Sequence, residues 1–227
     1  MPVQVPPNNG ASRRGGLRNF LIRVRRNQPE VVKMIGRAIR ALPQQHVLSP
    51  TIDDALLSDC RVLGNRYSLI DQLPKGGVVG EIGVDKGEFA DHILRTARPS
   101  GMHLFDIDFS RTNRAVTDHP AVIMHRGLSA DSLDVLPADM FDWIYVDGDH
   151  SYEGVCRDCR AAKAKVKPGG YLVFNDFALI DVYFGRYGVH RAVSEFLAAE
   201  RWPIRFFAFN THGLYDIAIQ KPLLTDV

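Results

Sequence analysis

Short apolar segments alternate with amphipathic ones from residue 78 onward, and this alternation constrains the fold more than any other feature of the chain. Seven segments have the length and composition of strands, and the first five are apolar on both faces, as buried parallel strands are. These predicted strands are residues 78–82, 103–107, 122–125, 143–146, 171–174, 204–209 and 214–220. Helical patterns lie between them at 88–97, 152–166 and 190–200. Strands that alternate with helices predict a parallel sheet with helices on both faces.

The C-terminal part departs from this alternation. Only residues 210–213 join the last two predicted strands, and so short a link forces an antiparallel hairpin. We therefore expect an α/β fold with a doubly wound, Rossmann-like sheet of seven mostly parallel strands and a C-terminal antiparallel hairpin. Two further helical patterns precede the sheet, one from Pro29 to about residue 42 and one at 52–73. The first of them predicts an N-terminal helical extension.

A chain of 227 residues is long enough for one sizeable core. We expect one domain at 46–227, preceded by a basic extension at 1–45 that begins as a disordered arm. The extension has one acidic residue, Glu30, and nine basic ones: Arg13, Arg14, Arg18, Arg23, Arg25, Arg26, Lys33, Arg37 and Arg40. A solvated tail followed by a packed helix is the first interpretation. Attraction to nucleic acid, phosphate or anionic lipid, or an organelle transit peptide, is the alternative.

Cysteine usage and hydropathy bear on the compartment. Cys60, Cys156 and Cys159 are too few and too unevenly spaced for a secreted disulfide framework. The C-x-x-C pair falls inside a predicted helix, so packing explains it better than zinc or redox chemistry does. No apolar run approaches the roughly 20 residues of a membrane-spanning helix. These features predict a cytoplasmic protein without a transmembrane segment.

The segment from Val78 to Phe89 runs from an apolar strand through a glycine turn into a helix, which is where ligands bind in such sheets. Gly83 and Gly87 allow the backbone to approach a ligand, and the helix start presents unpaired N–H groups. The spacing E-x-G-x-x-x-G differs from the dinucleotide pattern G-x-G-x-x-G, which disfavours a nicotinamide oxidoreductase. The carboxylate of Glu81 repels a diphosphate and suits a cationic amino-acid group instead.

Acidic and polar residues after the next two strands complete the predicted cofactor side. Asp106 lies about 20 residues beyond Gly87, the spacing of an acidic residue that binds ribose hydroxyls. Ile107 is expected beside the same nucleoside, and Asp108 is the alternative ribose ligand because a small error in the strand end would exchange the two. Ser129 follows the third predicted strand and is expected against adenine.

The segment F-D-W-I-Y-V-D-G-D-H-S-Y-E-G carries the most specific pattern in the chain. Its strand brings Asp147, Asp149 and His150 to the same sheet edge as the glycine turn, and the next strand ends in Asn175 and Asp176. Neighbouring strand ends lie only about 5 Å apart, so oxygen ligands converge there. Asp147, Asp176 and the Asn175 carbonyl suit a hard cation such as Mg²⁺, which acidifies a bound substrate hydroxyl.

The same residues also have simpler explanations. Asp147 and Asp176 can merely end strands and cap turns, as aspartate often does. His150 can act as a general base or can only orient the aspartates. We take Asp147, Asp149 and His150 as the candidate catalytic residues.

Four blocks of the sequence together resemble a known family: E-I-G-V-x-x-G-E-F, F-D-I-D, V-D-G-D-H-S-Y-E-G and K-P-G-G-Y-L-V-F-N-D-F. Over roughly residues 65–221 the chain resembles class I S-adenosylmethionine-dependent methyltransferases. Within that class it is similar to the small bacterial group related to macrocin O-methyltransferase and the cephalosporin-hydroxylase-like proteins.

The resemblance implies that S-adenosylmethionine is the cofactor and that a hydroxyl oxygen accepts the methyl group. Carried over by position, the cofactor-binding residues are Glu81, Gly83, Gly87, Asp106, Ile107, Ser129 and Asp147. Asp147 and Asp176 match metal-ligand positions of the metal-dependent relatives. Those relatives often have two adjacent acidic residues where this chain has Asn175 and Asp176.

The acceptor and the partners are open at this point. Residues 177–188, F-A-L-I-D-V-Y-F-G-R-Y-G, are rich in aromatic side chains and are expected to wall the acceptor pocket. A small hydroxylated molecule is the leading acceptor. RNA or another macromolecule held by the basic arm is the alternative, although the arm has few aromatic residues to interleave with bases. A homodimer is the candidate oligomer.

Overall fold

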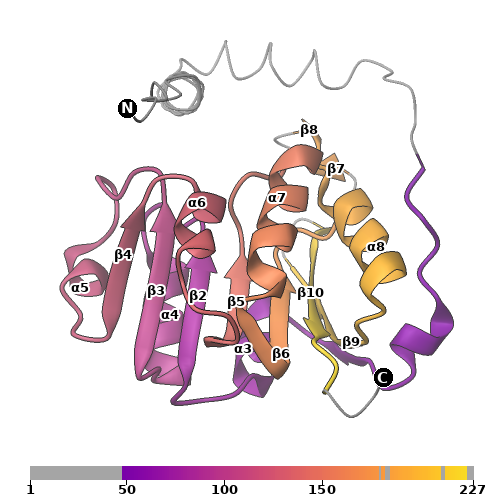
Figure 1. The fold of residues 1–227 in the computed structure, drawn as a ribbon, viewed down its shortest axis with the longest axis horizontal. Helices are drawn as coiled ribbons and strands as arrows, with labels where there is room; N and C mark the ends of the chain where they lie inside the picture. Colours follow the sequence, from indigo (N-terminus) through magenta and orange to yellow (C-terminus); the bar gives the residue numbers. More distant parts are fainter. Residues whose placement is uncertain (1–47, 179, 182–184, 211–212, 224–227) are drawn as a thin grey trace, which may run out of the picture. The chain divides into compact units, whose positions relative to one another are not determined.

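A computed structural model of the protein describes residues 48–178, 180–181, 185–210 and 213–223. Eight strands form its main sheet: β1 (Arg61–Leu63), β2 (Val78–Ile82), β3 (Gly101–Asp106), β4 (Val122–Arg126), β5 (Phe141–Val146), β6 (Val166–Phe174), β9 (Ile204–Phe209) and β10 (Tyr215–Gln220). Their order in space is β1-β9-β10-β6-β5-β2-β3-β4 (Figure 1). Only β10 runs antiparallel to its neighbours, β6 and β9. The predicted mostly parallel sheet with a C-terminal hairpin is therefore confirmed.

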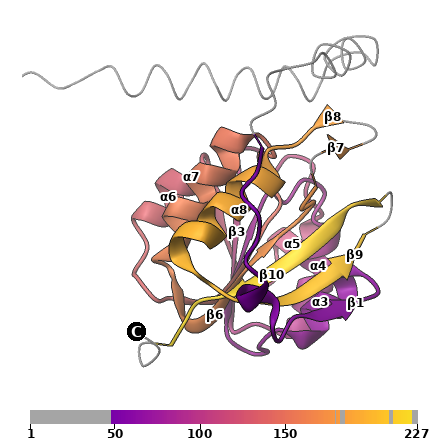
Figure 2. The same cartoon turned by 90° about the vertical axis from the view of Figure 1, so that its right-hand side faces the viewer.

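Helices cover both faces of the sheet, as predicted. They are η1 (Asp54–Leu57), α3 (Arg66–Gln72), α4 (Glu88–Ala97), α5 (Arg114–Thr117), α6 (Ser129–Asp134), α7 (Tyr152–Lys163) and α8 (Val189–Glu200). Apolar side chains of α6, α7 and α8 pack in one cluster with one face, and those of α3, α4 and α5 pack in a second cluster with the other. Figure 2 shows these two layers edge-on.

The prediction of a helix at 52–73 is wrong. This segment contains η1, the short strand β1 and the helix α3. Asp53 caps η1 by accepting from the Ala55 N–H, and Asn65 caps α3 by accepting from the Ser68 N–H. Between the two caps β1 pairs in parallel with β9, so the sheet has eight strands and not seven.

The predicted helix at 152–166 ends earlier, at Lys163, and β6 begins at Val166 instead of residue 171. The backbone explains this difference, because the carbonyl of Lys165 accepts from the N–H groups of Met140 and Phe141. These bonds draw the chain into the sheet directly after α7. The small hairpin β7 (Ile180–Asp181) and β8 (Gly185–Arg186) follows β6 within the predicted acceptor loop.

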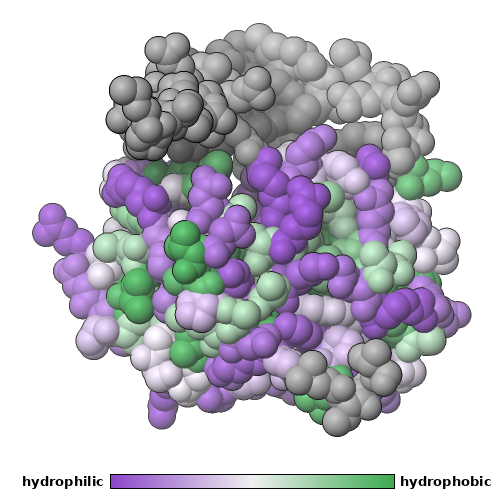
Figure 3. All heavy atoms as spheres, in the orientation of Figure 1, coloured by the Kyte–Doolittle hydropathy of each residue, from purple (hydrophilic) through white to green (hydrophobic). Residues whose placement is uncertain are grey.

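The predicted N-terminal extension at 1–45, with its helix from Pro29, lies outside the described residues and stays a prediction. Among the residues that are described, no helix combines the length and the apolar character needed to cross a membrane. On the face drawn in Figure 3, hydrophilic side chains predominate and apolar ones form separate small groups. Single exposed apolar residues such as Val135, which is 83% exposed, are ordinary for a protein surface.

Candidate active site

The order of strands changes direction between β2 and β5, which are neighbours in the sheet although β3 and β4 separate them in sequence. In sheets of this kind ligands bind beyond the carboxyl ends of the strands at such a switch point. The loops there are joined by backbone bonds. The Gly83 N–H donates to the Phe105 carbonyl, and the Asp147 N–H donates to the Ile82 carbonyl, each at 2.8 Å. The predicted cofactor loop and the predicted catalytic loop are thus in direct contact.

The two glycines of the cofactor loop are needed by the protein's own packing. Gly83 has φ +84°, and a Cβ there would overlap the carbonyl of Asp147. Gly87 has φ +79° at the N-cap of α4, and a Cβ there would lie 2.9 Å from the Thr112 side chain. The sequence assigned both glycines to the approach of a ligand, and the structure adds this second reason for each.

Glu81 is a buried acid on β2, one of the two strands at the switch point. It lies on β2 beside Tyr145 of β5 and is only 1% exposed. Its Oε2 atom has no hydrogen-bond partner among the described residues. Burial raises the pKa of Glu81 well above its usual value, the charge of Asp147 adds to the rise, and Arg66 opposes it. Because an unpartnered buried acceptor is costly, this atom fits a cationic group of a ligand.

Asp106 ends β3 and is buried, as predicted for a residue that faces the crevice. One carboxylate oxygen accepts from the N–H groups of Val84 at 2.9 Å and Asp85 at 3.1 Å, and the other accepts from the Asp108 N–H at 3.0 Å. Asp106 therefore orders the glycine loop. Asp108 is less buried and lies 3.7 Å from the Arg126 guanidinium. Binding of ribose by either aspartate stays a prediction.

The remaining predicted cofactor residues lie at the ends of β3 and α6. Ile107 follows Asp106 directly and is partly exposed. Ser129 begins α6, and its hydroxyl donates to the Asp158 carboxylate of α7 at 2.5 Å. Asp158 is itself buried, so this bond joins the two helices. Contact of Ile107 and Ser129 with a nucleoside stays a prediction.

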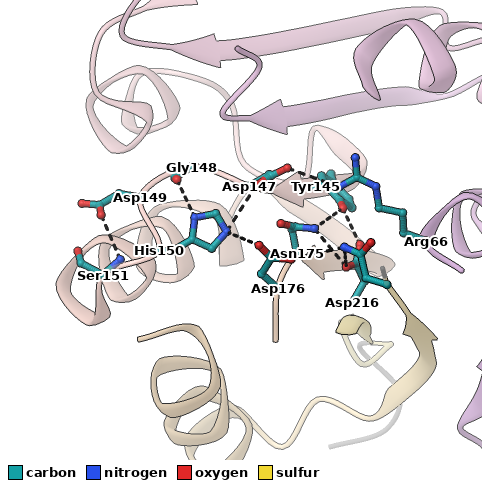
Figure 4. Close-up of polar contacts among 11 residues, drawn as sticks. Arg66, Tyr145, Asp147, Gly148, Asp149, His150, Ser151, Asn175, Asp176 and Asp216 are labelled. Atoms are coloured by element: carbon teal, nitrogen blue, oxygen red, sulfur yellow. Dashed lines mark hydrogen bonds and ion pairs between the residues drawn. The ribbon is translucent and has the colours of Figure 1, made fainter. Parts of the chain in front are cut away.

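At the end of β5 the ring of His150 lies between two aspartates (Figure 4). Its Nε2 atom is 3.5 Å from Asp147 Oδ1 and 3.6 Å from Asp176 Oδ2. This nitrogen is buried and has no hydrogen-bond partner in the described part of the chain. The other nitrogen, Nδ1, lies 3.1 Å from the Gly148 carbonyl, and the ring stacks on Tyr187 at 4.6 Å between centroids. The structure thus brings together three of the predicted site residues.

Asp147 is a strongly perturbed carboxylate of this cluster. Burial raises its pKa to about 7, although the charges of His150 and Arg66 lower it. Its side chain is still 26% exposed, so water reaches one side of the carboxylate. A carboxyl group with this pKa exchanges its proton near neutral pH, which suits a role in proton transfer.

The third predicted catalytic residue, Asp149, is not part of this cluster. Its carboxylate accepts from the Ser151 N–H at 3.1 Å and lies 3.5 Å from the Arg157 guanidinium. In Figure 4 it points to the far side of His150, toward the start of α7. Asp149 therefore lies in the turn before α7, away from the cluster of Asp147, His150 and Asp176.

Of the predicted magnesium ligands, Asp147 and Asp176 come together, and the side-chain amide nitrogen of Asn175 turns to other partners. The Asn175 side chain is buried, and its amide nitrogen donates to the Tyr145 hydroxyl at 3.1 Å and to Asp216 at 3.2 Å. Asp147 and Asp176 instead face the imidazole of His150. Within the described ranges no group of three His, Cys, Asp or Glu residues is arranged to hold a metal ion. The side chains present do not fit a metal centre, so Mg²⁺ stays a prediction from the sequence.

A second polar group, missed in the sequence, is buried between β5, β6 and β10. The Tyr145 hydroxyl donates to Asp216 Oδ2 at 2.6 Å, beside the Asn175 amide. Asp216 is fully buried, and burial raises its pKa to about 6 although the hydrogen bond from Tyr145 lowers it. The sequence signal that could have revealed this group is Asp216, an acidic residue inside an apolar strand.

Arg66 was also missed, because the sequence gives it no motif. It begins α3, and its guanidinium lies 4.3 Å over the ring of Phe89 in α4. One of its nitrogens is 3.9 Å from Asp147 Oδ2. Arg66 therefore places a cation between the helix that follows the glycine loop and the tip of β5.

The predicted aromatic wall at 177–188 is present only in part among the residues described. Tyr187 stacks on His150, as noted, but Phe177 is buried in the core against His190. Tyr183 and Phe184 lie outside the described residues. Tyr187 is the aromatic side chain of this loop that contacts a predicted catalytic residue among those described, and the acceptor pocket stays a prediction.

Residues 81–177 match a family model described as a methyltransferase domain. By this match, residues 81–177 are similar to a methyltransferase domain. An O-methyltransferase from Bacillus cereus, solved with S-adenosylhomocysteine, superposes on 85% of this chain and 90% of its own, with a TM-score of 0.54 and 18% identity. The N-methyltransferase NodS from Bradyrhizobium japonicum, also with S-adenosylhomocysteine, covers 69% and 86%, with a TM-score of 0.54 and 15% identity.

Other neighbours are longer than this chain. The pyocyanin biosynthetic protein PhzM superposes on 68% of the chain with a TM-score of 0.54 and 15% identity, and the match spans only 53% of PhzM. No curated protein sequence matches the chain. At these identities the neighbours define the fold of the methyltransferase domain and not its acceptor. The predicted class I methyltransferase is confirmed, whereas the smaller bacterial group stays a prediction.

Proposed function

We propose that the methyltransferase domain transfers the methyl group of S-adenosylmethionine to a hydroxyl oxygen of a small-molecule acceptor. The observation that carries this proposal is His150, whose Nε2 atom lies within 3.6 Å of two carboxylates. A hydroxyl is a weak nucleophile until its proton is removed. An imidazole flanked by two negative charges is suited to remove it.

The cofactor side of the crevice supports S-adenosylmethionine. When bound, this cofactor supplies an electrophilic methyl group on a positively charged sulfur. The unpartnered Oε2 atom of Glu81 would accept a hydrogen bond from the ammonium group of its amino-acid part. Asp106 orders the loop that would lie along the ribose. We assign the cofactor to these residues together with Gly83, Gly87, Ile107, Ser129 and Asp147.

His150 has the geometry of a general base. With Nδ1–H donating to the Gly148 carbonyl, Nε2 keeps its lone pair and accepts the proton of the acceptor hydroxyl. The oxygen then forms its bond to the methyl carbon as the sulfur–carbon bond breaks. Asp147 and Asp176 stabilise the imidazolium that results, since both lie close to the protonated nitrogen. Stacking on Tyr187 fixes the plane of the ring.

This proposal uses no metal ion, because Asp147 and Asp176 serve the imidazole and the Asn175 amide serves Tyr145 and Asp216. An assay run in EDTA tests it. Methyl transfer from radiolabelled S-adenosylmethionine to a panel of phenols, sugars and matched amines should yield O-methylated products. His150→Gln should lower kcat about 100- to 10,000-fold, and the exposed control Glu153→Gln should not. N-methylated products, or turnover that requires added Mg²⁺, would contradict the proposal.

A macromolecular acceptor is the competing proposal, and it is tied to the basic residues before position 45. Arginine side chains that grip phosphates make binding strongly dependent on salt. Removal of residues 1–28 separates the two acceptors. Unchanged turnover on a small hydroxylated acceptor supports the proposal above, and loss of activity on an RNA substrate alone supports the competitor.

A further inference from the structure

Acidic side chains outnumber basic ones around Glu81 in the described part of the chain. Asp147 and Asp106 both act on Glu81 through their charges, and Asp176 acts on Asp147 in the same way. The cation that acts on both Glu81 and Asp147 is Arg66. Binding a ligand that carries only positive charge would need the acidic residues and no arginine. The fixed arginine beside them is suited to a ligand that carries both signs.

Arg66 is held on the same face of the sheet as Glu81. Glu81 pairs with Tyr145 across β2 and β5, and the Tyr145 ring packs at 4.4 Å on Phe89. The Arg66 guanidinium lies over the same Phe89 ring at 4.3 Å. Asp147 continues this face of β5 two residues beyond Tyr145. Arg66 and Glu81 thus both lie against the tip of β5.

In the described part of the chain, the N–H groups of Arg66 remain available to a ligand. Its distance of 3.9 Å to Asp147 Oδ2 is longer than a hydrogen bond, so the contact is an ion pair without a direct N–H···O bond. The side chain is 23% exposed, so solvent or a ligand can reach part of it. A guanidinium presents a planar fork of N–H groups that matches the two oxygens of a carboxylate.

We propose that Arg66 binds the carboxylate of the cofactor's amino-acid part while Glu81 binds the ammonium group one carbon away. This inference rests on the proposed function, because it assumes S-adenosylmethionine as the ligand. It assigns a cofactor-binding role to a residue outside the matched segment 81–177. Figure 4 shows Arg66 reaching from α3 toward Asp147 at the edge of this site.

The test compares two ligands that differ only in that carboxylate, S-adenosylmethionine and decarboxylated S-adenosylmethionine, by calorimetry on the full chain. The wild-type protein should bind S-adenosylmethionine about 10- to 100-fold more tightly. Arg66→Gln should remove this preference by weakening S-adenosylmethionine alone. Arg66→Lys keeps the charge without the fork and should retain part of the preference.

The control is Arg61→Gln, which removes another arginine of the same segment, one that hydrogen-bonds to Gln72 and not to the crevice. It should leave both affinities unchanged. A preference that survives in Arg66→Gln, or an equal loss of affinity for both ligands, would overturn the inference. A wild-type protein that binds S-adenosylmethionine without preference overturns the inference alone. A wild-type protein that binds neither ligand nor S-adenosylhomocysteine refutes the proposed function, and the inference with it.

Discussion

Glu81→Gln should stabilise the ligand-free protein and weaken its binding of the cofactor. The two effects have opposite signs because the buried carboxyl group destabilises the ligand-free protein, whereas it binds the ammonium group when the cofactor is present. Glu81 is 1% exposed and its Oε2 atom is unpartnered among the described residues. Glutamine has nearly the same shape and does not ionise, so the substitution removes the charge and leaves the packing.

The magnitude follows from the burial of that atom. Glutamine keeps a polar group at the same place, so the substitution removes only the cost of ionisation, about 1.4 kcal/mol for each pH unit above the ordinary pKa until the raised pKa is reached. In a domain of this size a change of 1 kcal/mol moves the melting temperature by about 2 to 4 °C. The variant should therefore melt roughly 2 to 12 °C higher than the wild-type protein at a pH about one to two units above the ordinary pKa of Glu81.

The pH dependence of the free energy of unfolding tests the sign of this stability effect in a second way. The pKa of Glu81 is raised in the folded state, so between its ordinary value and the raised one the folded protein holds a proton that the unfolded chain has lost. Wild-type stability therefore falls across that window as the pH rises. The advantage of Glu81→Gln should be small below the ordinary pKa and should grow toward pH 8.

Thermal melts at pH 4.5, 6 and 8, with and without S-adenosylhomocysteine, measure all of this. The exposed residue Glu153 provides the control, and Glu153→Gln should shift the melting temperature little at any pH. The ligand should raise the melting temperature of the wild-type protein and of the control more than that of Glu81→Gln. A variant that melts lower than the wild-type protein at pH 8, or gains as much from the ligand, would refute the reasoning.

Two further predictions concern the neighbouring aspartates. Asp106→Ala should weaken S-adenosylmethionine binding by about 1 to 3 kcal/mol in a calorimetric titration, and an effect of that size from Asp108→Ala instead would transfer the ribose assignment to Asp108. The kcat/KM of the wild-type protein for S-adenosylmethionine reports the ligand-free enzyme and should rise with pH through about 7, because Asp147 must lose its proton to stabilise the imidazolium of His150. In Asp147→Asn this rise should disappear, and an unchanged profile would exclude Asp147 from that role.

The sequence predicted the elements whose signals are local. α4 lies at the predicted residues because its apolar face has helical period and its N-cap glycine and C-terminal arginine both adopt left-handed backbone. β1 was missed since it has only three residues, two of them exposed, at the edge of the sheet. Its partner β9 comes more than a hundred residues later, which no local pattern reveals.

The same distinction applies to the site. Asp147, His150 and Asp176 were predicted to converge because each follows a strand, and strand ends in a parallel sheet meet at one edge. The contact of the Asn175 amide nitrogen with Asp216 was not predicted, because Asp216 belongs to β10. The antiparallel hairpin inserts β10 beside β6, and spacing along the chain does not show which interior side chain then lies next to Asn175.

The raised pKa values at the crevice have one physical origin, which connects cofactor binding to proton transfer. Burial raises the pKa of Glu81 and of Asp147, and the charge of Asp147 adds to the rise for Glu81. A ligand that brings an ammonium group and a sulfonium into this crevice supplies the missing positive charge. It lowers both pKa values, so Asp147 becomes ionised at neutral pH when the methyl donor is present. We therefore expect ionised Asp147 to stabilise the His150 imidazolium most strongly in the complex with the methyl donor. In the product complex the sulfur is neutral, so this stabilisation should be weaker.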